Sequence, residues 1–233
     1  MKRLTLIILG VLLCTPLYSD MNPYIAGVPV SGGVTYLVQE DFEGTGTPSG
    51  WVQAYHEGYH ALPNFDYTTT VLEGSESMYL SGTGWLKDQA VSTPTLTAGD
   101  DRYIGFMYRI PTMPTTGVNV ITIMNGSSRL AYFLQGVNGR ILAKLEGGES
   151  VVNPDGVVSA DTTYYVKVRY QSGEPAILTV WFSSNGTSWA QVLQTDDTDI
   201  ASGMTSVSFW SSEGNSFTPI IDLVRIADED FDF

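Results

Sequence analysis

The chain has 233 residues, of which 43% are hydrophobic and 15% are charged, so it carries enough apolar side chains for a large core, and wholesale disorder is excluded. The 25 acidic residues outnumber the 11 basic ones and give a formal net charge of −14. Because Lys and Arg must neutralise phosphate charge in complexes with nucleic acid or anionic membranes, this balance argues against both as partners. Neutral glycans suit such a surface better than polyanionic ones. The length favours one large domain over two small ones.

The first residues of the chain have the pattern of a signal peptide. Residues 1–3 supply a basic start, and residues 4–17 form an apolar stretch that is too short to span a bilayer. Cleavage after Ser19 also removes the only cysteine, Cys14, and leaves 9 basic against 25 acidic residues, a net charge of −16. We therefore expect a secreted or periplasmic protein without disulfides. Translation from Met21, without any signal, is the alternative.

The remaining chain divides into three parts. Residues 20–34 are rich in Gly and Pro and are predicted to form an extended lead-in. Residues 35–228 are predicted to form one domain, and residues 229–233 to follow it as an acidic tail. The tail has alternating carboxylates but lacks the glycine and the distal Glu of a calcium-binding loop, so we expect it to be solvated.

Alternation of apolar and polar residues with a period of two, broken by turn residues, predicts a series of strands. No stretch has the apolar stripe of an amphipathic helix, so the predicted class is all-β. The predicted strands are 36–43, 77–81, 86–91, 102–110, 118–124, 129–136, 139–146, 162–171, 176–183, 188–193, 203–211 and 217–227.

The alternation gives each strand one apolar face. In the strand 102–110, for example, Ile104, Phe106 and Tyr108 point to the same side. Short polar connections such as Asn125-Gly126 suit antiparallel hairpins. One apolar face per strand is what two stacked sheets require, so the sequence predicts a two-sheet antiparallel jelly-roll β-sandwich.

Four strand and turn elements carry a family resemblance. They are Tyr164–Tyr170, Leu178–Phe182, the Ser183–Trp189 hairpin and Ile221–Ile226. Together they resemble the concanavalin A-like lectin/glucanase superfamily, particularly its laminin-G-like modules, over about residues 36–227. These are strand and turn motifs rather than catalytic ones. The resemblance implies a jelly roll with a lectin-like function.

The two ends of the domain resemble a rival family. Phe42-Glu43-Gly44 followed by Trp51, and Ile221-Asp222 near the end, are similar to motifs of carbohydrate-binding modules with a galactose-binding-like jelly roll. In that family the carboxylates of these motifs help to bind structural calcium, so the resemblance implies a Ca²⁺ site at Glu43 and Asp222. Calcium needs six to eight oxygen ligands, and solvated carboxylates at strand ends are the alternative. The opening stretch also resembles domains of phage tail and other virion proteins.

The segment His56-Glu57-Gly58-Tyr59-His60 fits the H-E-x-x-H pattern and contains both histidines of the chain. In zinc proteases this spacing places both imidazoles on one face of a helix, with the Glu beside a metal-bound water. Here a glycine interrupts the segment, Pro63 follows it, and the neighbouring elements are predicted strands. We therefore interpret the match as a coincidence in a loop.

No glycosidase motif accompanies the predicted fold. A concanavalin-like glycosidase carries E-x-D-x-E or E-x-D-x-x-E, in which alternate carboxylates share one face of a strand, and the sequence contains no such run. A polyuronate lyase needs clustered Arg, Lys, His and Tyr. Arg102, Arg109, Lys167 and Arg169 supply part of such a set, but the net charge opposes it. The chain is therefore not predicted to be an enzyme.

Aromatic side chains on polar strand faces are the predicted ligand-binding residues. Sugar rings stack on such side chains while neighbouring polar groups bind the hydroxyls. Trp181 and Trp210 stand among small polar residues, opposite the apolar face of their strands, and Tyr103 and Arg109 occupy the corresponding side of theirs. The alternative is that loops cover these faces and the rings form a second core layer.

These features together predict an exported, non-catalytic, lectin-like module that binds neutral glycans. The second hypothesis is a structural or adhesive surface protein, for example a virion or phage-tail decoration that self-assembles or associates with particles. The third is a polysaccharide hydrolase or lyase. We expect no cofactor other than structural calcium and no transmembrane span.

Overall fold

The computed structural model describes residues 34–54, 62–80, 89–153, 156–211 and 217–233. The predicted signal peptide, all but the last residue of the lead-in and the His56–His60 segment lie outside the described residues.

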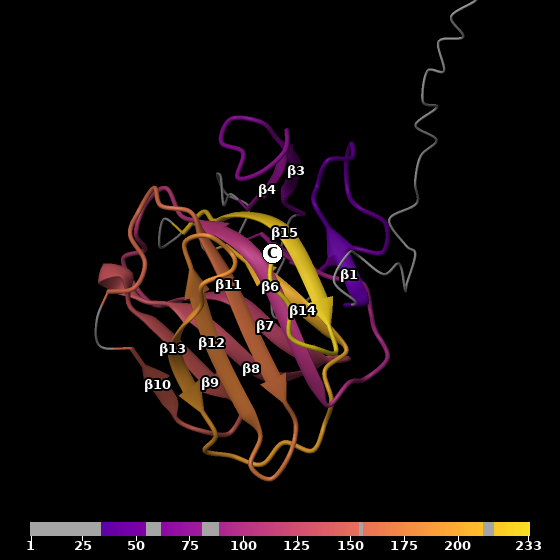
Figure 1. Ribbon diagram of the computed structural model, residues 1–233, viewed down its shortest axis with the longest axis vertical. Helices are drawn as coiled ribbons and strands as arrows, with labels where there is room; N and C mark the ends of the chain where they lie inside the picture. The colour runs from indigo at the N-terminus through magenta and orange to yellow at the C-terminus, as the bar shows by residue number, and fades with distance from the viewer. Residues whose placement is uncertain (1–33, 55–61, 81–88, 154–155, 212–216) are drawn as a thin grey trace, which may run out of the picture.

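Two antiparallel sheets face each other across a core (Figure 1). The front sheet contains, in spatial order, β13 (Ala190–Thr195), β12 (Ile177–Ser183), β11 (Tyr164–Gln171), β6 (Asp101–Arg109), β15 (Ile220–Ala227), β4 (Ser77–Tyr79) and β3 (Asn64–Tyr67), and β1 (Tyr36–Glu40) also pairs with β15. The back sheet contains β10 (Ser150–Val152), β9 (Ile141–Leu145), β8 (Ser128–Gln135), β7 (Val118–Asn125), β14 (Ser206–Trp210), β5 (Ala90–Ser92) and β2 (Val52–Gln53).

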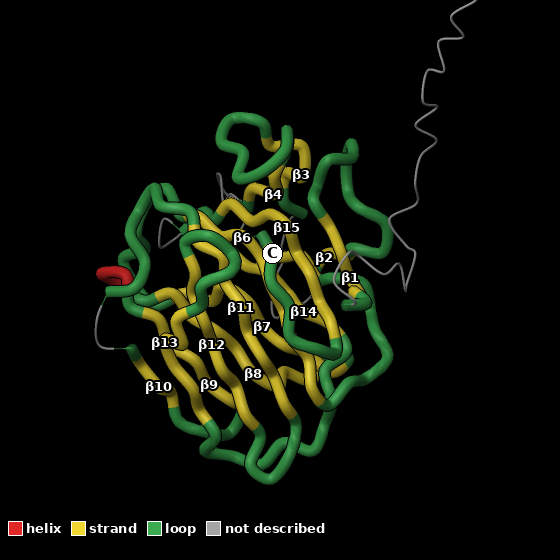
Figure 2. The backbone as a smooth tube through the Cα atoms, viewed as in Figure 1, coloured by secondary structure: helices red, strands yellow, loops and turns green. Residues whose placement is uncertain are grey.

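The predicted all-β class and jelly-roll sandwich are confirmed. Within the described chain, the single exception to strand and loop is a short 3-10 turn, η1 (Val137–Gly139), coloured red in Figure 2. No helix in this part of the chain is long and apolar enough to cross a bilayer. Strands β2, β3 and β10 are missing from the predicted set, because two to four residues are too few to display an alternation.

The alternate residues of each long strand meet between the sheets. Ile104, Phe106 and Tyr108 of β6 are fully buried, as are Val207 and Phe209 of β14 in the opposite sheet. The rings of Phe106 and Phe209 pack edge to face with their centroids 5.4 Å apart, which joins the two sheets at the centre of the core. The predicted strand faces are therefore confirmed.

The first and last strands lie side by side, so the opening and closing motifs meet. β1 pairs antiparallel with β15. Phe42, just after β1, and Leu223, within β15, adopt positive φ angles of 56° and 46°. Such angles are rare for large side chains and persist only where the surroundings hold them. Both bends lie next to a carboxylate, Glu43 and Asp222.

The acidic tail is packed on the protein, so the prediction that it is solvated is wrong. Figure 1 shows the chain turning back after β15, with its end in front of β6 and β15. Phe231 is only 4% exposed and packs edge to face on Tyr36, with centroids 5.2 Å apart. The acidic side chains of the tail remain exposed. Its alternation thus turns the rings toward the sheet and the carboxylates toward solvent, and we call residues 228–233 the strap.

Candidate functional site

The structure divides the four predicted ligand-binding residues between two faces. Trp181, Tyr103 and Arg109 lie on the outer face of the front sheet, whereas Trp210 lies on the outer face of the back sheet. The core separates these faces, so the four residues do not form one groove. Each face is therefore a separate candidate.

On the front sheet the three predicted residues do not converge. The Lys167 Nζ lies 5.9 Å from the ring centre of Trp181, and the guanidinium of Arg169 lies 5.4 Å from that of Tyr103. Burial raises the pKa of the Tyr103 hydroxyl. Arg109 lies at the end of β6 and forms an ion pair of 3.3 Å with an exposed aspartate. The strap crosses β6 between Tyr103 and Arg109, so these side chains do not form a continuous platform.

A row of polar and aromatic side chains crosses the outer face of the back sheet. The strand registers place five residues opposite one another on β9, β8, β7, β14 and β5, in the order Lys144, Tyr132, Thr122, Ser208 and Ser92. Their neighbours along each strand point into the core. Trp210 lies two residues beyond Ser208 on the same face. We call these six residues the polar row.

Small side chains form the floor of the polar row, and larger ones flank it. The hydroxyls of Ser92 and Ser208 are hydrogen-bonded at 2.6 Å, and Ser208 and Thr122 are each only 3% exposed. Tyr132 and Trp210 are half-buried and keep part of their surface accessible. A sugar on this face would therefore contact the two rings rather than the floor hydroxyls.

Two cations lie at the Tyr132 end of the polar row. Lys144 is directly opposite Tyr132 on the neighbouring strand. The guanidinium of Arg129 lies 4.7 Å from the ring centre of Tyr132 and forms an ion pair of 2.6 Å with Glu146. A cation over an aromatic face is held by the quadrupole of the ring. This end thus combines a phenol with positive and negative groups, a set that can bind hydroxyls and carboxylates.

Sequence reasoning found only Trp210 of this row. Ser92, Thr122 and Ser208 alternate with apolar residues and are indistinguishable from ordinary outward-facing positions. Tyr132 and Lys144 give the same weak signal on their own strands. What makes these residues a row is the register of five strands, and a single sequence does not specify that register.

The two predicted calcium ligands, Glu43 and Asp222, converge on the loop between β3 and β4. The Glu43 carboxylate accepts hydrogen bonds from the N–H of Ser75 at 2.8 Å and from its hydroxyl at 2.5 Å. Asp222 accepts hydrogen bonds from the N–H of Glu73 at 3.2 Å and from the hydroxyl of Ser77 at 2.8 Å. The opening and closing motifs therefore hold this loop between them.

Burial changes the pKa values of these carboxyl groups. It raises the pKa of Glu40 to about 7 and that of Asp222 to about 6, and repulsion from neighbouring carboxylates adds to both increases. Burial acts in the same direction on Glu43, but hydrogen bonds, the strongest from the Ser75 hydroxyl, outweigh it and lower its pKa. At neutral pH this corner therefore holds negative charge that water solvates poorly and that a cation would neutralise.

The corner around Glu43 and Asp222 fits a calcium site in part. A neighbouring pocket of about 280 Å³ is lined by Glu40, by Asp41 and by residues 44–49, which include three hydroxyl side chains, whereas Glu43 and Asp222 themselves do not line it. Carboxylate, hydroxyl and carbonyl oxygens are the ligands that Ca²⁺ prefers. Across the described residues, however, no three His, Cys, Asp or Glu side chains are grouped closely enough to hold a metal. Backbone and hydroxyl oxygens would have to complete the coordination.

The fold is shared with proteins of very different sequence. No family model and no curated protein sequence matches the chain. An endo-β-1,4-glucuronan lyase from the fungus Trichoderma reesei superposes with a TM-score of 0.60 at 14% identity, over 85% of this chain and 98% of the lyase. A cellulose-induced protein, Cip1, gives 0.61 at 16% identity, over 82% and 97%. The globular domain of T. cruzi calreticulin gives 0.52 at 12%, over 84% and 89%. These likenesses show a common β-sandwich jelly-roll fold.

Proposed function

We propose that this chain is an exported carbohydrate-binding jelly roll whose glycan lies across the outer face of the back sheet. The observation that carries the proposal is the polar row, in which the rings of Tyr132 and Trp210 flank a floor of small hydroxyl side chains. Such rings stack on the C–H faces of sugars. The same fold in a lyase that acts on glucuronan and in a protein induced by cellulose adds support. The net charge of −14 favours neutral glycans.

Removing either ring should weaken glycan binding. We expect Trp210→Ala and Tyr132→Ala each to raise the dissociation constant for a neutral polysaccharide, such as a β-glucan or a xylan, about fivefold. Each variant loses a stacking contact worth about 1 kcal/mol. Electrophoresis through gels that contain the polysaccharide identifies the ligand, and calorimetry with its oligosaccharides measures the change.

Trp181→Ala is the matched control, because it removes the same type of side chain from the other face of the sandwich. It should leave the affinity unchanged. If Trp181→Ala weakens binding and Trp210→Ala does not, the glycan lies on the front sheet instead. If the intact chain retains none of the neutral polysaccharides, the proposal is wrong.

A second candidate function, cleavage of an acidic polysaccharide, is favoured by the charges around Tyr132. A polyuronate lyase transfers the C5 proton of a uronate to a base, breaks the C4–O bond, protonates the departing oxygen and leaves a C4=C5 double bond. Arg129 and Lys144 suit the uronate carboxylate, and Tyr132, whose ring contacts Arg129 and which lies opposite Lys144, carries a hydroxyl that can exchange a proton.

The ultraviolet absorbance of the unsaturated product tests this candidate with polyglucuronate and alginate as substrates. Turnover that Tyr132→Phe abolishes without loss of binding would establish a lyase. If absorbance does not increase with either substrate, lyase activity on these two polyuronates is excluded and the binding function is the one that remains.

We also propose that Glu43 and Asp222 contribute to a structural calcium site. Ca²⁺ in hundredfold excess over its dissociation constant should stabilise the folded chain by about 2.7 kcal/mol, which raises the unfolding midpoint by at least about 5 °C. Scanning calorimetry with Ca²⁺, Mg²⁺ or EDTA measures this shift. Glu43→Gln should remove most of the response to Ca²⁺, whereas a midpoint that is the same in Ca²⁺ and EDTA would exclude the site.

A further inference from the structure

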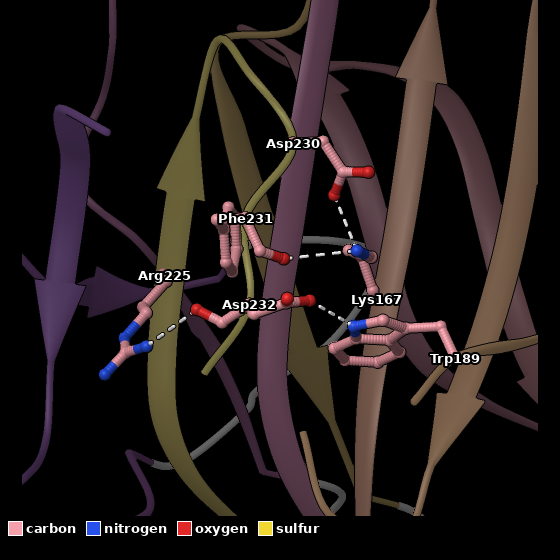
Figure 3. A network of polar contacts seen from close by, with 6 residues as sticks. All are labelled: Lys167, Trp189, Arg225, Asp230, Phe231 and Asp232. Carbon is pink, nitrogen blue, oxygen red and sulfur yellow. Dashed lines mark hydrogen bonds and ion pairs between the residues drawn. The ribbon is translucent and has the colours of Figure 1, made fainter. Parts of the chain in front are cut away.

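The strap is held by polar contacts that come from the front sheet and the β12–β13 hairpin (Figure 3). Lys167 is only 4% exposed although it lies on an outer face. Its Nζ donates hydrogen bonds to the Asp230 carboxylate at 2.5 Å and to the backbone carbonyl of Phe231 at 3.1 Å. The indole N–H of Trp189 donates to Asp232 Oδ1 at 2.6 Å. A buried ammonium group needs such partners, and here both belong to the strap.

The two rings of the strap occupy space that a glycine leaves open. Phe233 packs against Tyr165, with centroids 5.2 Å apart, and under the guanidinium of Arg225 at 5.0 Å. Gly105 of β6 lies beneath both rings of the strap. A Cβ on Gly105 would be 2.7 Å from ring carbons of Phe231 and of Phe233, closer than any normal contact. The absence of a side chain at this position therefore creates the floor on which the rings lie.

We infer that the outer face of the front sheet is a binding site for an extended acidic-aromatic peptide, which the strap fills from within the same chain. Four consecutive side chains each have their own contact: Asp230 with Lys167, Phe231 with Tyr36 and the Gly105 floor, Asp232 with Trp189, and Phe233 with Tyr165 and Arg225. The N–H of Phe233 also donates to the carbonyl of Gly186 at 3.2 Å. Side-chain and backbone contacts together specify both sequence and direction.

The external occupant that fits this site is the same segment of a second copy of the chain. Because the strap follows β15 directly, its effective concentration at the site is of the order of millimolar. A free peptide at micromolar concentration therefore does not displace it from the intact chain. A chain that ends at Asp228, by contrast, presents an empty site to the strap of another molecule.

The test titrates a chain ending at Asp228 with a synthetic peptide, Glu-Asp-Phe-Asp-Phe, which corresponds to residues 229–233. Calorimetry and tryptophan fluorescence should show saturable one-to-one binding to the shortened chain and none to the intact chain at the same concentrations. A peptide with both Phe replaced by Ala should bind at least tenfold more weakly. If the shortened chain does not bind the peptide, or binds a scrambled version equally well, the inference is overturned.

Gly105→Ala tests the same site in the full chain, which removes any dependence on the folding of the shortened one. The added methyl group should detach the strap, so that residues 229–233 become sensitive to carboxypeptidase while the circular dichroism of the sandwich is unchanged. Gly117→Ala is the control, because a Cβ there meets nothing within 4 Å. A strap that remains as resistant in Gly105→Ala as in Gly117→Ala would contradict the site. Neither readout depends on glycan binding.

Discussion

Replacing Phe209 by Ala should reduce the free energy of unfolding by about 3–5 kcal/mol, measured by chemical denaturation. Phe209 is fully buried, and its ring lies 5.4 Å from that of Phe106 and 6.2 Å from that of Trp51. These three rings come from β14, β6 and the residue before β2, so the truncation removes contacts from both sheets at once. Two hydrogen-bonded sheets do not close easily over the resulting cavity, and the lost contacts are not replaced.

Two further variants distinguish the stability cost of the cavity from the cost of a substitution as such. Phe209→Leu keeps most of the volume and should cost less than half as much as Phe209→Ala. Val52→Ala removes a side chain that is 54% exposed and should change stability by no more than about 0.5 kcal/mol. A cost below about 1 kcal/mol for Phe209→Ala would contradict the placement of this ring between the sheets.

The fold could be predicted from the sequence because the alternation within each long strand shows which of its side chains face the core. Ile104, Phe106 and Tyr108 repeat with a period of two, and the structure buries all three. Short strands such as β2 lack that signal and form by pairing with longer neighbours. In the strap, by contrast, the alternation is present but the prediction did not follow it. Phe231 and Phe233 also alternate with carboxylates, but the acidic composition of the segment outweighed this pattern in the prediction that it is solvated.

The candidate site was less predictable, because it depends on which residues of adjacent strands lie opposite one another. Tyr132, Thr122 and Ser208 meet only through the registers of β8 with β7 and of β7 with β14. No local pattern encodes these registers. The family resemblance implied one calcium site for Glu43 and Asp222, and the structure brings both carboxylates to the loop between β3 and β4. Metal binding there stays a prediction.

The two outer faces of the sandwich differ in what is available to a ligand. On the front sheet, Lys167 and Gly105 are covered by the strap, which leaves Trp181 and Tyr103 at its margins. On the back sheet, Tyr132 and Trp210 are half-buried, as Trp181 and Tyr103 are, so the two faces differ in the strap and not in the exposure of single rings. The strap therefore argues for placing a glycan on the back sheet, although three of the four sequence-predicted residues lie on the front one.

Acidification from about pH 8 to about pH 5.5 should stabilise the calcium-free chain by roughly 2 kcal/mol. The folded chain raises the pKa of Glu40 to about 7 and that of Asp222 to about 6, mainly through burial. In the unfolded chain both groups return to ordinary values of about 4. Between about pH 4 and about pH 7 the folded state therefore binds more protons than the unfolded state. The free energy of unfolding falls as the pH rises through 6 and 7. At lower pH, protonation of Glu43, whose pKa folding lowers, removes its contribution and sets the acid limit.

Denaturation in EDTA at several pH values measures this slope, and Glu40→Gln identifies its main source. The amide oxygen of Gln can still accept the hydrogen bond from the Phe42 N–H, which is 2.9 Å in length, but it carries no charge. The variant should therefore be more stable than the parent chain at about pH 8 and should lose most of the pH dependence. Saturating Ca²⁺ should flatten the slope, because a bound cation favours the ionised carboxylates. A parent chain that loses stability on acidification over this range would show that Glu40 and Asp222 are ionised without penalty in the folded state.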